Sequence, residues 1–254
     1  MRRARKALQQ IDCGAKDVAA IGRSERGHIK VGIFSSLASG FLSDLLGAYG
    51  KEHASVRVEF FDGDPADHVA SIRRLQLDVA FITGTTQWSD CETEQLWSER
   101  VFAVLPSDHP LSEKSELGWR DLVDERFIVS DGAPGSEIHD YLVQRLADLG
   151  RHPEIDTQYV GRDNLLSLVA IGQGVTVMSE AGTAAQFPGT AYRQLAGEVL
   201  PFCAVWSPRN DNPAWRRLLS LARSMSRSAA ATIIQTVSAV LLTSSLSQIP
   251  DPWL

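Results

Sequence analysis

Residues 27–46 read GHIKVGIFSSLASGFLSDLL, and this stretch decides the fold more than any other. Alternating apolar side chains over 29–33 predict a strand, and apolar side chains at helical spacing over 41–49 predict a helix soon after it. Two small polar residues, Ser35 and Ser36, stand between them. A helix that begins at the end of a strand presents free backbone N–H groups, which bind small anions. The stretch therefore indicates a small-molecule site, unless the serines only cap the helix.

The alternation of strand and helix continues along the chain. Strands are predicted at 29–34, 56–61, 79–83, 101–106, 126–130, 155–160, 175–179 and 202–206, and helices at 1–22, 40–51, 65–76, 135–149, 163–172, 180–187 and 213–226. This order is typical of an α/β fold with parallel strands and helices on both faces of the sheets. The turn at 107–111 and the return segment at 200–207 indicate two Rossmann-like lobes joined by a two-segment hinge, with a cleft between them.

This interpretation divides the chain into four parts. The predicted ranges are 27–105 plus 204–226 for lobe I, 106–203 for lobe II, 1–26 for an N-terminal helical segment, and 227–254 for a C-terminal extension whose role stays open. The extension contains an uncharged stretch at 228–248 that is long enough to span a membrane. Its many alanine, serine and threonine residues favour an amphipathic or partner-packing helix instead, so no membrane partner is expected.

Composition narrows the class of protein. A net charge of −6 on 254 residues argues against broad binding of a nucleic-acid backbone, and the hydrophobic share of 44% is ordinary for a globular protein. The three cysteines are far apart and match no metal spacing, which is typical of free thiols in a reducing compartment. No secretory signal follows the basic N-terminus. We expect a cytoplasmic protein without a metal or other cofactor.

Further polar groups follow other predicted strands. Thr83 ends the strand at 79–83, and a loop with Ser130, Asp131 and Gly135 follows the strand at 126–130. Ligands of open α/β sheets bind at such carboxyl ends of strands, although ordinary turns explain the same residues. Arg162 precedes the helix at 163–172, and its planar guanidinium suits a carboxylate, unless it is only a surface charge.

Catalytic patterns do not emerge from the sequence. It contains no Gly-x-Ser-x-Gly, no His-Glu-x-x-His and no phosphate-binding loop with lysine. The acidic run at 92–99 is interpreted as a solvated face, and Asp62 and Asp64 as turn residues. We therefore predict that the protein is not an enzyme.

Several of these segments together resemble the effector-binding domain of LysR-type transcriptional regulators. The resemblance covers about residues 27–226 and is carried by IKVGIFSSL at 29–37, LDVAFI at 77–82, VLPSDHPL at 104–111, DLVDERFIV at 121–129 and LVAIGQGV at 168–175. It implies a two-lobed, periplasmic-binding-protein-like (type 2) fold and regulation of transcription. It also implies a small, often anionic effector between the lobes. The implied effector-binding residues, together with Arg162, are Ser35, Ser36, Leu37, Thr83, Ser130, Asp131, Gly135, Asp163 and Asn164.

The resemblance also suggests how the protein assembles. It implies a homodimer or homotetramer in which the helices at 40–51 and 213–226 pair through apolar residues such as Phe41, Leu45 and Leu218. Residues 1–26 then correspond to the end of the family's linker helix. DNA is expected as a partner only through a helix-turn-helix, which these 254 residues do not contain. The alternative is a stand-alone solute-binding protein of the same fold.

Overall fold

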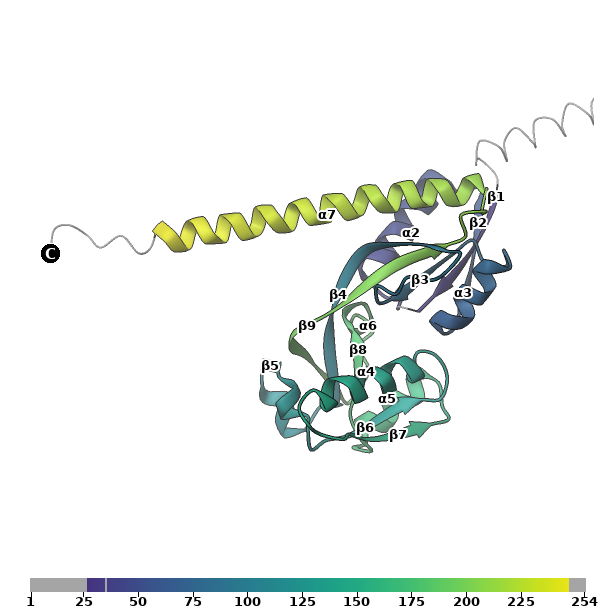
Figure 1. Cartoon of the computed structure of the whole chain (residues 1–254). Helices are drawn as coiled ribbons and strands as arrows, with labels where there is room; N and C mark the ends of the chain where they lie inside the picture. Colours follow the sequence, from purple (N-terminus) through teal and green to yellow (C-terminus); the bar gives the residue numbers. More distant parts are fainter. Residues whose placement is uncertain (1–26, 35, 247–254) are drawn as a thin grey trace, which may run out of the picture.

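The computed structural model describes residues 27–34 and 36–246, and Figure 1 shows their arrangement. The predicted helix at 1–22, Ser35 and residues 247–254 lie outside the described residues. The strands are β1 (Gly27–Ile33), β2 (Val56–Asp62), β3 (Val79–Thr83), β4 (Glu92–Pro106), β5 (Glu116–Leu117), β6 (Arg126–Ser130), β7 (Glu154–Gln158), β8 (Thr176–Ser179) and β9 (Thr190–Trp206). The helices are α2 (Gly40–Glu52), α3 (Pro65–Arg73), α4 (Gly135–Ala147), α5 (Arg162–Ala170), α6 (Glu180–Thr183) and α7 (Pro213–Leu246), with short 3-10 turns η1 (Pro110–Glu113) and η2 (Trp119–Asp121).

The first lobe is built around β1, which pairs in parallel with β2 on one side and β3 on the other. Alternate residues of β3 face opposite sides of this sheet. Phe81 packs with α2 and α7, whereas Ile82 packs with α3. Tyr49 of α2 is fully buried against α7, and its hydroxyl donates a hydrogen bond of 2.9 Å to the carbonyl oxygen of Ala214. These contacts hold the helices at fixed positions around the sheet.

The second lobe repeats the layout on a smaller scale. β6 and β7 pair in parallel, and successive residues of β6 face opposite sides. Phe127 packs with Leu142 of α4, whereas Ile128 packs with Leu165 of α5. The predicted α/β class with two lobes is confirmed. Helix α4 begins beyond the carboxyl end of β6, and α5 begins beyond the carboxyl end of β7, so both helices start at the same edge of this small sheet.

Two long strands connect the lobes. β4 leaves the first lobe and β9 returns to it, and the two pair antiparallel along most of their length (Figure 1). β3 and β8 also pair antiparallel with them. The expectation of purely parallel sheets is therefore wrong, because an outward and a returning strand must run in opposite directions.

The acidic run at 92–99 belongs to β4, not to a solvated face. Leu96 is buried, Glu99 is only 5% exposed, and Glu94 pairs with Arg223 of α7 through several hydrogen bonds of 2.6 to 3.0 Å. The predicted strands at 101–106 and 202–206 are too short, because β4 already begins at Glu92 and β9 at Thr190. Val101, Ala103 and Leu105 pack in the core of the second lobe, so we propose that the lobe boundary along β4 falls near Arg100 instead of residue 105.

Several helix limits also differ from the predictions. The turn at 107–111 leads into η1 within the second lobe, and α6 ends at Thr183 instead of residue 187. Gly161 occupies the N-cap of α5, so this helix begins at Arg162 instead of residue 163. The predicted helix at 213–226 is part of α7, which continues to Leu246 and extends beyond the first lobe (Figure 1). None of the helices in the described part of the chain combines the length and apolar character needed to cross a bilayer.

The apolar residues expected at a subunit interface are used inside the first lobe. Leu45 of α2 and Leu218 of α7 are fully buried in one core cluster, and Phe41 stacks on the ring of Trp97. Leu45 and Leu218 therefore cannot form the interface that we predicted for them, whereas Phe41 is only partly buried and the pairing of the two helices between subunits stays a prediction.

Candidate functional site

A cleft of about 970 Å³ lies between the two lobes. The first lobe contributes the ends of β1, β2 and β3, and the second contributes the ends of β6 and β7 with the first turns of α4 and α5. Ligand sites of parallel sheets occur at these edges because connecting loops and helix N-termini gather there. The walls include apolar side chains from both lobes, among them Leu37, Ile138 and Phe202.

Seven of the ten predicted site residues line the cleft. They are Ser36, Leu37, Thr83, Ser130, Asp131, Gly135 and Arg162. Asp163 and Asn164 lie in the exposed first turn of α5 and are not among the lining residues, and Ser35 lies outside the described residues.

Arg162 connects the two walls of the cleft. Its Nη1 donates to the Ser36 hydroxyl oxygen over 3.3 Å, and its Nη2 donates to the carbonyl oxygen of Gly182 over 3.0 Å. Ser36 does not cap the following helix, because α2 begins only at Gly40. Its hydroxyl oxygen instead accepts a hydrogen bond from the backbone N–H of Ala38. Arg162 and Ser36 thus place a guanidinium and a hydroxyl side by side, an arrangement that suits a carboxylate.

The loop between β6 and α4 is held by a very close approach of the Gly135 backbone to the Ser130 backbone. A Cβ atom on Gly135 would lie 1.6 Å from the carbonyl oxygen of Ser130, so only glycine fits. The Ser130 hydroxyl donates to the carbonyl oxygen of Val160 over 2.6 Å, which joins the loops that follow β6 and β7. Gly135 therefore shapes the wall of the cleft and brings the first turn of α4 to it.

The sequence reasoning missed several lining residues. Asp62 was interpreted as a turn residue, but it ends β2 and lines the cleft next to the end of β1. Glu137 and Asp140 lie in the first two turns of α4, and Thr176 begins β8. A usable signal existed for Asp62, because it directly follows the predicted strand at 56–61, much as Thr83 ends the strand at 79–83. The sequence shows no comparable pattern at Glu137, Asp140 or Thr176.

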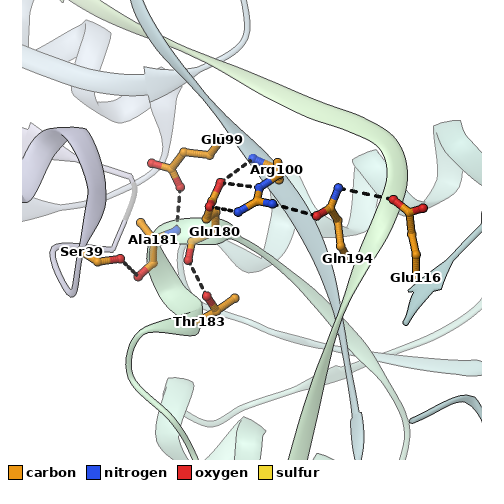
Figure 2. A network of polar contacts seen from close by, with 8 residues as sticks. All are labelled: Ser39, Glu99, Arg100, Glu116, Glu180, Ala181, Thr183 and Gln194. Carbon is orange, nitrogen blue, oxygen red and sulfur yellow. Dashed lines mark hydrogen bonds and ion pairs between the residues drawn. The ribbon is translucent and has the colours of Figure 1, made fainter. Parts of the chain in front are cut away.

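A polar network ties α6 to both crossing strands beside the cleft, as Figure 2 shows. Arg100 of β4 pairs with Glu180 and donates to Gln194 of β9 over 3.0 Å. The hydrogen bond from Arg100 lowers the pKa of the Glu180 carboxyl, so this pair stays ionised at neutral pH. The hydroxyl of Ser39 in the first lobe donates to the carbonyl oxygen of Ala181 over 3.1 Å. The network therefore links α6 to the point where the chain passes between the lobes.

Glu99 is the buried centre of this junction. Its two carboxylate oxygens accept hydrogen bonds from the indole N–H of Trp97, over 2.8 Å, and from the backbone N–H of Ala181, over 3.1 Å. Glu99→Gln replaces one acceptor with an NH₂ group that faces a donor. We expect it to lower the free energy of unfolding by about 1–3 kcal/mol, measured by urea denaturation. Glu116→Gln, at the exposed end of the same network, is the control and should change it by less than about 0.5 kcal/mol. Equal effects of the two substitutions would contradict this role of Glu99.

Comparison with known proteins places this arrangement in one family. The profile of the LysR substrate binding domain matches residues 22–227. The transcriptional dual regulator GltC of Bacillus subtilis is 25% identical over 183 residues, which span 72% of this chain and 60% of GltC. The regulator XapR of Escherichia coli is 25% identical over 205 residues, spanning 80% of this chain and 69% of XapR.

Two solved structures share the fold. Full-length CbnR in complex with its target DNA superposes with a TM-score of 0.74 at 15% identity, covering 89% of this chain and 77% of CbnR. The effector-binding domain of BenM with its effector benzoate superposes with a TM-score of 0.70 at 19% identity, covering 80% of this chain and 94% of that domain. The relatives that match in sequence are transcriptional regulators.

Proposed function

The chain belongs to the LysR substrate binding domain family, and we propose from this that it is the ligand-sensing domain of a LysR-type transcriptional regulator. The observation that carries the proposal is the cleft of about 970 Å³, in which strand ends and helix starts of both lobes meet. Because Arg162 reaches from the second lobe to Ser36 in the first, a ligand held there would contact both lobes. Such a ligand stabilises one lobe arrangement over others, which is how binding shifts a conformational equilibrium.

The effector that we propose is a small molecule with an anionic group. Arg162 and Ser36 supply a charged donor and a hydroxyl, and Ser130 and Thr83 add polar groups to the same cleft. The structural neighbour BenM was solved with benzoate, a carboxylate, as its effector. The apolar walls of the cleft suit the carbon skeleton of such a compound.

The response we propose is a change in assembly. Lobe closure bends the paired strands β4 and β9 where they pass between the lobes, and the surfaces beside them move with the lobes. We expect a homodimer or homotetramer that acts on DNA in the cytoplasm through a helix-turn-helix region, as regulators of this family do. The apolar residues Leu45 and Leu218 are not part of the interface, because they are buried within the first lobe.

A thermal-shift screen tests the sensing function. Small carboxylates, aromatic acids, amino acids and sugar phosphates are each added to the purified chain. A compound at 100 times its Kd adds about 2.7 kcal/mol of stability, which is a shift of roughly 5–11 °C in Tm for a domain of this size. Failure of every class to raise the Tm would contradict the proposal, as would a ligand whose affinity is unchanged by both Ser36→Ala and Arg162→Ala.

A further inference from the structure

The charges that line the cleft are mostly negative. The described residues that form its walls include four residues with a carboxyl group and one with a guanidinium, Arg162. The lining carboxylates are Asp62, Asp131, Glu137 and Asp140. An effector that carried only negative charge would gain from Arg162 but would be repelled by each of the four carboxylates.

The carboxylates come from both lobes. Asp62 ends β2 in the first lobe, and Asp131 directly follows β6 in the second. No described residue donates a hydrogen bond to the carboxylate of either one or forms an ion pair with it. Burial raises the pKa of the Glu137 carboxyl, and the negative charge of Asp64, which precedes α3 in the first lobe, raises it further. Glu137 accepts a hydrogen bond from Ser136, and Asp140 contacts the ring of His139. The lining carboxylates without a partner among the described residues are therefore Asp62 of the first lobe and Asp131 of the second.

A second observation points to a polar ligand in the same cleft. Thr176 lines the cleft and is only 2% exposed, yet its hydroxyl oxygen has no hydrogen-bond partner among the described residues. Val175 and Val177 pack in one core cluster of the second lobe, so the Thr176 side chain faces the cluster on the other side of β8, where Leu165 and Met178 also line the cleft. Buried hydroxyl groups nearly always have a partner, and an unpaired one in a cavity wall suits a ligand atom.

We propose that the effector is a zwitterion, with an ammonium group that faces Asp62 and Asp131 and a carboxylate that meets Arg162 and Ser36. An amino acid with an apolar side chain is the simplest compound of this class, since the remaining walls are largely apolar. The ammonium group supplies a positive charge for Asp62 and Asp131, which have no cationic partner among the described residues, and Thr176 hydrogen-bonds to a polar atom of the ligand. The inference rests on the proposed sensing function and specifies its ligand.

Matched sets of compounds test the two charges separately. The common amino acids, the corresponding acids without the amino group, and the corresponding amines without the carboxylate are titrated into the full chain by calorimetry. We expect at least one amino acid to bind roughly 10- to 100-fold more tightly than its deaminated acid and its amine, because a charged hydrogen bond is lost in each.

Three variants assign the preference to residues. Asp62→Asn with Asp131→Asn should reduce the advantage of the amino acid over the deaminated acid to about threefold or less, with little change in Tm. Thr176→Val, which keeps the side-chain shape, should weaken binding of the same amino acid by roughly fivefold. Asp108→Asn removes an exposed carboxylate outside the cleft lining and is the control. It should change neither the preference for the amino acid over the deaminated acid nor the affinity for the amino acid.

The outcomes separate this inference from the function on which it rests. If the deaminated acids bind as tightly as the amino acids, or if only other compounds bind, the zwitterion assignment is wrong and the sensing function stands. If the double Asn variant keeps the full preference, Asp62 and Asp131 do not recognise the ammonium group and the assignment is again wrong. If no compound of any class binds, both proposals fail.

Discussion

Gly135→Ala is expected to lower the free energy of unfolding by about 3 kcal/mol or more, the largest effect on stability that we predict for a single methyl group. The added Cβ would lie 1.6 Å from the carbonyl oxygen of Ser130, far inside van der Waals contact. A Cβ atom and a carbonyl oxygen are both fixed by the backbone, so no side-chain rotation relieves the overlap and the loop must move. Thermal denaturation should show a decrease in Tm of roughly 6–12 °C.

Gly132→Ala is the matched control in the same loop. A Cβ on Gly132 meets no atom within 4 Å, so we expect a change of less than about 1 kcal/mol. Because the loop also forms a wall of the cleft, Gly135→Ala should weaken ligand binding as well. Similar Tm values for the two variants would show that the close approach of Gly135 to Ser130 does not constrain the loop.

The inner strands β1, β3 and β6 could be predicted because most of their residues are buried and their pattern is simple. Ile29 and Val31 are fully buried on a strand with parallel neighbours on both sides, and a short apolar run predicts this. The first half of β4 could not be predicted in the same way. Its acidic residues resemble a solvated segment, and only the tertiary partners Ala181 and Arg223 explain why Glu99 and Glu94 fit there.

The candidate site could be predicted where a polar residue ends a strand or closely follows one. Ser36, Thr83 and Ser130 were found in this way, and all three line the cleft. The family resemblance implied Asp163 as a site residue, but the first turn of α5 presents Arg162 to the cleft, and Asp163 is exposed and not among the lining residues. Residues one or two turns into a helix, such as Asp140, reach the cleft only through the packing of α4, which no local pattern reveals.

Arg162→Ala is expected to raise the Kd of the tightest-binding compound from the screen roughly 10- to 100-fold. A charge-assisted hydrogen bond contributes about 1.5–3 kcal/mol, and the guanidinium is the single cationic group among the described lining residues. Arg162→Lys should recover only part of the affinity, because an ammonium cannot reach Ser36 and a ligand carboxylate with the same planar geometry. Calorimetric titration measures both variants.

The stability of these variants distinguishes a binding role from a structural one. Arg162 is exposed, and its bonds to Ser36 and Gly182 are to uncharged oxygens, so we expect the free energy of unfolding of Arg162→Ala to fall by less than about 1 kcal/mol. Arg120→Ala, an exposed arginine that does not line the cleft, should leave both affinity and stability unchanged. If Arg162→Ala retained full affinity, the anionic end of the effector would have to be bound elsewhere. Because no other described lining residue carries a positive charge, backbone N–H groups at the starts of α4 and α5 would then be its binding site.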